Sequence, residues 1–147
     1  MIRILDANAL ISLYHDGKAV RAEQKCYVPE EIADELRSDP GAEAWLKTLP
    51  LESVRLDEVE YLQAYADYVN RYSGVSFYSL KGFGDVAVLA TLQILVRRLP
   101  PTPTLSKEVF PEDTIYLVSD DRTLRKFVEK TFPGTVELEA LSDFLAK

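Results

Sequence analysis

Three aspartates in this chain stand where an apolar segment ends or begins. Asp6 follows the apolar run Ile2–Leu5, Asp121 follows another at Thr114–Ser119, and Asp85 precedes the longest one. Aspartate is a favoured helix N-cap, which is the ordinary explanation for Asp85 and Asp121. Asp6 is the hardest to explain structurally, because it lies between a buried strand and an apolar helix. In open α/β sheets, ligands bind at the carboxyl ends of the strands.

Carboxylates that converge at one sheet edge have a predictable chemistry. Their like charges repel and raise one another's pKa values, so a fold that keeps them needs a compensating charge. Hard divalent cations with oxygen ligands supply it, and Mg²⁺ or Mn²⁺ is expected. Zinc is not expected, because Cys26 is the only cysteine and His15 the only histidine.

The elements that must position these acids alternate between strand and helix. The pattern predicts strands at 2–6, 25–28, 53–56, 114–119 and 135–138, and helices at 7–15, 30–37, around Trp45, at 57–72, from Asp85, at 121–131 and at the end of the chain. Such alternation predicts an α/β fold with a central parallel sheet flanked by helices. We expect one domain over residues 1–147, with irregular loops at 73–84 and at the proline-rich segment 99–112.

Composition narrows the class of protein. The chain has 147 residues, is 47% hydrophobic and carries a net charge of −7. We expect a globular, cytoplasmic protein without a secretory signal or a membrane partner. The acidic balance argues against a purely electrostatic nucleic-acid binder. It does not exclude a metal-dependent enzyme that acts on nucleic acid.

Four short segments together resemble the PIN-domain family of metal-dependent nucleases. They occur in the family's order and extend over nearly the whole chain: Leu5-Asp6-Ala7-Asn8-Ala9-Leu10, Val28-Pro29-Glu30-Glu31-Ile32-Ala33-Asp34-Glu35-Leu36, Gly84-Asp85-Val86-Ala87-Val88-Leu89-Ala90 and Val118-Ser119-Asp120-Asp121-Arg122-Thr123-Leu124. No segment is specific alone. The ordered set carries the resemblance.

The resemblance implies a three-layer Rossmann-like fold and a quartet of acids that binds Mg²⁺ or Mn²⁺. Asp6 and Asp85 match the first and third acids. Glu35 matches the second, with Glu31 as the alternative one turn earlier. The fourth acid maps to Asp121, with Asp120 as an auxiliary residue. The implied activity is hydrolysis of RNA phosphodiester bonds.

Further residues could assist this chemistry. Asn8 and Ser119 could orient a carboxylate or a water molecule. Lys81, Arg122 and Arg125 could contact substrate phosphates and provide the local positive field that the net charge lacks. Ordinary surface charge is the alternative reading of these three cations.

The predicted helix 57–72 carries a second pattern. Tyr61, Tyr65, Tyr68 and Tyr72 share one face of it. The neighbouring face has Val59, Leu62, Ala66 and Val69, and we expect this apolar face to be the core side. The tyrosines would then stack on bases, form a homodimer or partner interface, or widen the core.

Four functions are compatible with these patterns. The main interpretation is an endoribonuclease. It would be either the toxin of a toxin–antitoxin pair or an enzyme of RNA turnover. The first of these would have an antitoxin protein as its partner. A catalytically silent PIN-like module that binds RNA or protein is the alternative. A phosphoacceptor receiver domain is disfavoured, because Asp6 stands alone after the first strand and no lysine follows the last one.

Overall fold

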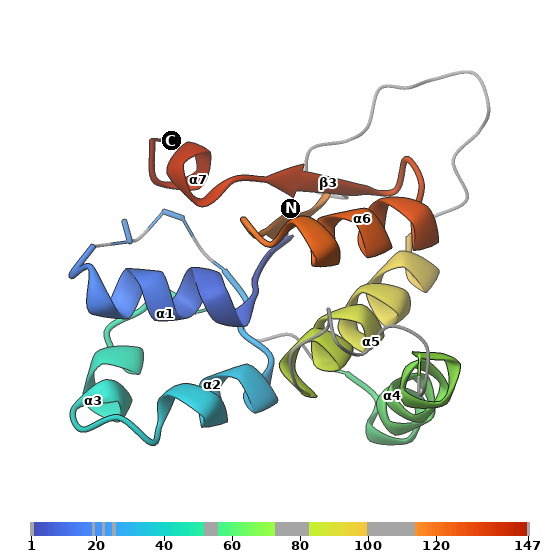
Figure 1. Ribbon diagram of the computed structural model, residues 1–147, viewed down its shortest axis with the longest axis horizontal. Coiled ribbons are helices and arrows are strands. Elements are labelled where there is room, and N and C mark those ends of the chain that lie inside the picture. The colour runs from blue at the N-terminus through green and yellow to red at the C-terminus, as the bar shows by residue number, and fades with distance from the viewer. Residues whose placement is uncertain are drawn as a thin grey trace.

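The computed structural model describes residues 2–18, 20–21, 23–24, 26–51, 56–72, 83–99 and 114–146. Within these residues, three strands form one parallel sheet in the order β1-β2-β3. The strands are β1 (Ile2–Leu5), β2 (Ile115–Val118) and β3 (Val136–Glu139). Seven helices accompany them in the same part of the chain, and together these elements make an α/β fold with the sheet flanked by helices (Figure 1).

The helices follow the predicted order. Their bounds are α1 (Ala7–His15), α2 (Glu30–Leu36), α3 (Ala42–Leu46), α4 (Glu58–Tyr72), α5 (Phe83–Arg97), α6 (Arg122–Thr131) and α7 (Leu141–Ala146). Each crossover between neighbouring strands of the sheet contains at least one of these helices, as parallel pairing requires.

The predicted strand at 25–28 is present only as isolated parallel bridges. Tyr27 lies beside Ile4, and Cys26 lies beside Leu51. The Tyr27 amide donates to the Arg3 carbonyl over 2.7 Å, so this short segment extends the sheet past β1. Pro29 has no amide hydrogen to donate and begins the turn into α2, which stops the pairing. The strand predicted at 53–56 and the proline-rich segment fall mostly outside the described residues.

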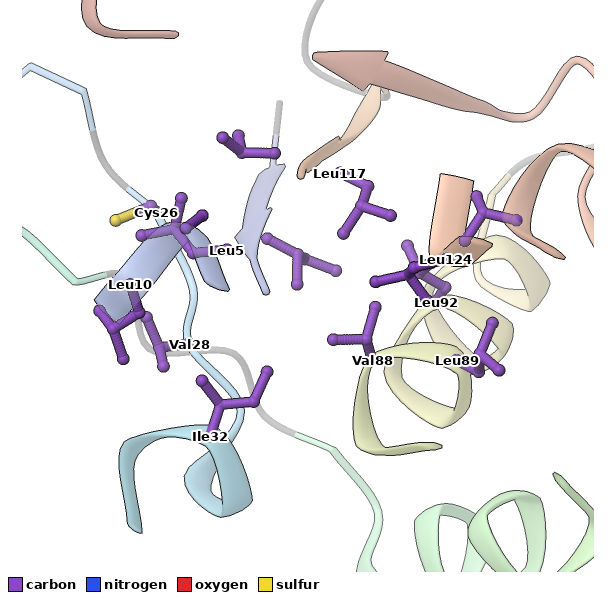
Figure 2. Packing of buried hydrophobic residues seen from close by; sticks show 14 of the residues in the cluster. Leu5, Leu10, Cys26, Val28, Ile32, Val88, Leu89, Leu92, Leu117 and Leu124 are labelled. Carbon is purple, nitrogen blue, oxygen red and sulfur yellow. The ribbon is translucent and has the colours of Figure 1, made fainter. Parts of the chain in front are cut away.

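Both faces of the sheet are buried at the ends of β1 and β2. Ile4 and Leu5 point to opposite faces, and neither is exposed to solvent. Figure 2 shows Leu117 of β2 on the side of the core where Val88 and Leu92 of α5 lie, while Leu10, Cys26 and Val28 lie near Leu5 of β1. Burial on both faces explains why the central strand β2, Ile115-Tyr116-Leu117-Val118, reads as a continuous apolar run instead of an alternating one.

Helix α5 is the most buried helix, as its apolar sequence predicted. Every residue from Asp85 to Leu92 is buried. It begins earlier than expected, however. Because α5 starts at Phe83, Asp85 is its third residue and not its N-cap. The N-cap explanation of Asp85 is therefore wrong, and the carboxylate lies inside the first turn of the helix.

The expected orientation of α4 is also wrong. Ala64 and Tyr68 are buried, whereas Val59 is 65% exposed and Leu62 is 56% exposed. The tyrosine face therefore packs inward, and most of the predicted core face is open to solvent. A tyrosine ring offers more apolar area than valine or alanine, so burying the aromatic face gains more free energy. The side chain of Tyr72 lies outside the described residues.

No helix in the described ranges is long and apolar enough to cross a membrane.

The two faces of α4 can be compared by truncation. We expect Tyr68→Ala to lower the free energy of unfolding by about 3–5 kcal/mol, because it removes a buried ring. The matched truncation Leu62→Ala, on the exposed face, should change it by less than about 0.5 kcal/mol. Urea denaturation of both variants measures the difference, and equal losses would mean that the α4 orientation is incorrect.

Candidate functional site

Asp6 and Ser119 meet at the carboxyl edge of the sheet. In the parallel pair of β1 and β2, Leu5 lies opposite Val118, which brings the next residue of each strand together. The Ser119 hydroxyl donates a hydrogen bond to Oδ2 of Asp6. Both side chains are buried. Ser119 therefore orients a carboxylate, which is one of the roles predicted for it.

Asp6 also has a structural role that the sequence interpretation did not assign to it. Its Oδ1 accepts the Ala9 amide over 2.7 Å and caps the N-terminus of α1. Helix capping therefore gives one structural reason for an aspartate at this position. Each carboxylate oxygen accepts one hydrogen bond here, which leaves further lone pairs for another ligand.

Asp121 caps the next helix in the same manner. Its Oδ1 accepts the Thr123 amide over 2.9 Å and the Leu124 amide over 3.1 Å. Its own amide donates to the Ser119 hydroxyl over 3.1 Å. Ser119 therefore connects Asp6 and Asp121. Both capping bonds go to Oδ1, so Oδ2 could still bind a cation while Asp121 caps the helix.

Asp120 has a separate structural partner. Its Oδ1 accepts the Leu141 amide over 3.2 Å, at the first residue of α7. Its charge nevertheless contributes to the raised pKa of Asp6. Asp120 therefore lies near Asp6 while it is bonded to the first residue of α7.

Burial and like charge act together on Asp85. This side chain is only 7% exposed. Burial is the largest cause that raises its pKa from 3.8 to about 7, and the charges of Asp121, Asp6 and Glu35 raise it further. Three carboxylates from separate parts of the chain therefore raise the pKa of a single buried group.

The pKa of Asp6 is raised as well. Burial is the largest cause, and it outweighs the hydrogen bonds from Ser119 and Ala9, which act in the opposite direction. Asp121 and Asp120 add repulsion. A carboxylate at a helix N-terminus is normally stabilised in its charged form. The surroundings of Asp6 reverse that preference.

The two glutamates of α2 have different surroundings. Glu35 is exposed, and its charge is one of those that raise the Asp85 pKa. Glu31 instead accepts a hydrogen bond from the Tyr61 hydroxyl of α4 over 2.9 Å. The pKa of Tyr61 is raised by burial first and then by this contact. The sequence pattern placed Tyr61 on the tyrosine face of the helix, but it did not predict the hydrogen bond to Glu31.

The group fits a hard divalent cation by its chemistry, since all four members are carboxylates whose repulsion a cation would relieve. Its geometry is less complete. Among the described residues, no three His, Cys, Asp or Glu side chains lie close enough together to hold a metal ion. The acids are thus electrostatically coupled without forming an assembled ligand set.

The remaining candidates are spread more widely. Arg125 donates to the Ser119 carbonyl over 2.9 Å, so it lies at the end of β2, and Arg122 is exposed at the start of α6. Asn8 is exposed in the first turn of α1. His15 lies at the other end of α1, 3.5 Å from Asp39 and outside the acidic group. Lys81 lies outside the described residues.

Comparison of the chain with protein-family models, with curated proteins and with solved structures finds no match.

The Asp85 pKa makes stability depend on pH. Because its folded value lies above its value in the unfolded chain, the folded protein binds more protons between about pH 4 and pH 7. The stability that Asp85 contributes is therefore lost as the pH rises through 7. We expect Asp85→Asn to raise the free energy of unfolding at pH 8 by on the order of a few kcal/mol, and this gain should vanish near pH 4.

Urea denaturation of both proteins between pH 4 and pH 8 measures this difference. A gain that did not depend on pH would show that Asp85 titrates normally.

Proposed function

We propose that this chain is a PIN-like endoribonuclease that hydrolyses RNA phosphodiester bonds with Mg²⁺ or Mn²⁺. The observation that supports it best is that the charges of Asp121, Asp6 and Glu35 all raise the pKa of the buried Asp85. Like-charged carboxylates destabilise a fold when nothing compensates them. Two of these acids, Asp6 and Asp121, follow the carboxyl ends of two neighbouring parallel strands, which is where α/β folds bind ligands.

Asp6, Glu35, Asp85 and Asp121 would hold the cation. When bound, such a cation lowers the pKa of a coordinated water and offsets charge on the phosphate. The remaining tasks belong to the chain itself. The Ser119 hydroxyl fixes the Asp6 carboxylate, and the backbone amides of Thr123 and Leu124 fix Asp121. Asp85 must lose its proton to act as a ligand, which favours activity above pH 7.

RNA is the proposed substrate, and cations near the acids would hold its phosphates. Arg125 is placed at the end of β2 by its hydrogen bond to the Ser119 carbonyl. Arg122 directly follows Asp121, and Lys81 precedes Asp85 by four residues. Local positive charge of this kind allows an acidic protein to bind a polyanion.

A catalytically silent PIN-like module that binds RNA or protein is the second candidate. It is favoured by the finding that no three possible ligands among the described residues lie close enough to hold a metal ion. The enzyme is favoured instead by the mutual repulsion of the acids, since three carboxylates raise the pKa of the buried Asp85. An antitoxin partner is an expectation from the same family resemblance, and a homodimer is an expectation from the tyrosine pattern of α4; both are separate from the proposed chemistry.

The substitution Asp6→Asn tests the enzyme directly. Asparagine keeps an oxygen that can accept the Ala9 amide and is itself a good N-cap, so α1 should still form. It removes the negative charge that a cation requires. We expect cleavage of a fluorescent RNA in Mn²⁺ to fall at least about 100-fold, with an unchanged circular dichroism spectrum.

Asp16→Asn is the matched control. Asp16 is the C-cap of the same helix, about 15 Å from Asp6 along its axis. Its replacement should leave the cleavage rate unchanged. Wild-type cleavage by Asp6→Asn would refute the proposed chemistry, and an inactive wild-type protein that still binds RNA would support the silent module.

A further inference from the structure

Helix α6 carries a row of positive charge along its exposed face. Arg122, Lys126 and Lys130 follow one another at intervals of four residues, so they share one face of the helix, and all three are exposed. These three residues form the α6 basic stripe. We infer that the stripe binds the sugar–phosphate backbone of single-stranded nucleic acid. The inference concerns binding alone, so it requires neither a bound cation nor cleavage.

The charge of α6 contrasts with that of the whole chain. The helix has four basic residues and a single acidic one, Glu129, whereas the net charge of the chain is −7. Its opposite face is anchored in the core, since Leu124 and Val128 are fully buried and the helix packs beside β3 (Figure 1). A firmly held helix therefore presents the stripe to solvent.

The stripe has no ionic partner within the described part of the chain. None of the ion pairs between described residues includes one of its members. Other arginines do have such partners, since Arg3 pairs with Glu139 and Arg37 pairs with Glu30. Arg125 also differs from the stripe, because its guanidinium donates to a backbone carbonyl at the end of β2. The charges of the stripe are thus open to an external anion.

Helix stability does not explain the stripe. Arg122 is the first residue of α6, at the end where the helix macrodipole favours anions. Like charges four residues apart repel each other, and Lys126 takes part in two such pairs. Lys130 alone lies in the last turn, where a cation is favourable. A bound polyanion would relieve the repulsion along the whole stripe.

The geometry of the stripe fits a chain of phosphates. Its members are separated by about 6 Å along the helix axis, which is comparable to the separation of neighbouring phosphates in an extended strand. A flexible single strand can follow such a row of cations. Asp121 already occupies the amides of Thr123 and Leu124, so side chains alone would hold the phosphates.

The two lysines should contribute more to this binding than Arg122. Asp120 and Asp121 directly precede Arg122, and their negative charge opposes a phosphate at that end. Lys126 and Lys130 lie further along the helix from these acids. Substitution of the lysines therefore tests the stripe without altering a residue next to the acidic edge of the sheet.

Fluorescence anisotropy with a short labelled oligouridylate tests the inference, in a buffer whose EDTA removes divalent cations. We expect Lys126→Gln/Lys130→Gln to weaken binding at least about 5-fold. The slope of log affinity against log salt concentration should become shallower by about 0.7 for each lysine removed. Oligothymidylate of the same length should show the same loss, because the stripe contacts phosphates and not bases or 2′-hydroxyls.

Two double variants serve as controls. Lys126→Arg/Lys130→Arg keeps both charges and should bind like the wild-type protein. Lys18→Gln/Lys47→Gln removes the same amount of charge from exposed positions after α1 and at the C-cap of α3, and should leave the salt dependence unchanged. Circular dichroism should be the same for all variants, since every substituted residue is exposed.

The inference is overturned if the two glutamine double variants lose equal affinity, because net charge alone would then explain binding. It is also overturned if the wild-type protein binds no oligonucleotide in EDTA, or if polyglutamate competes as well as RNA, which would indicate an acidic protein partner. A protein that cleaves no RNA in Mn²⁺, yet loses affinity when the two lysines are replaced, would overturn the proposed enzyme and support the stripe.

Discussion

The parallel pairing of β1 and β2 is the constraint that brings Asp6 and Asp121 to the same edge of the sheet. Its register places Asp6 beside Ser119, and the two are joined by a hydrogen bond from the Ser119 hydroxyl. Helices α1 and α6 begin directly after these strands, each capped by an aspartate. A change of one residue in this register would separate the two caps and rotate the side chains of a strand to the opposite face of the sheet. Backbone pairing, helix capping and the arrangement of the acids are therefore one structural feature.

The same feature creates an electrostatic conflict. The hydrogen bonds to Asp6 favour its charged form, while burial and the neighbouring acids oppose it more strongly. Asp85 is in a similar position without any stabilising contact among the causes of its shift. A proton can relieve this conflict at low pH, and a divalent cation can relieve it at high pH. Stability and ligand binding are thus expected to depend on the same ionisation.

Much of the fold was predictable, because apolar runs and helix periodicity report burial directly. The strands at Ile2–Leu5 and Ile115–Val118 and the order of the helices follow from such local patterns. The start of α5 was mispredicted because an aspartate before an apolar run is also the signal of an N-cap. The buried face of α4 was mispredicted because tyrosine is amphipathic, and only the packing against α5 decides which face is covered. For the site, the neighbouring positions of Asp6 and Asp121 were predictable from strand ends. The bond between Tyr61 and Glu31 was not, since it joins helices that are distant in sequence.

Anomalous scattering from crystals soaked in Mn²⁺ tests the central claim most directly, because it locates the cation without reference to activity. If the coupled acids form a cation site, a single region of anomalous density, for one or two ions, should appear between Asp6, Asp85 and Asp121, with Glu35 as the ligand from α2. Well-diffracting crystals with no density at this edge of the sheet, or with density only at other surface carboxylates, would contradict it.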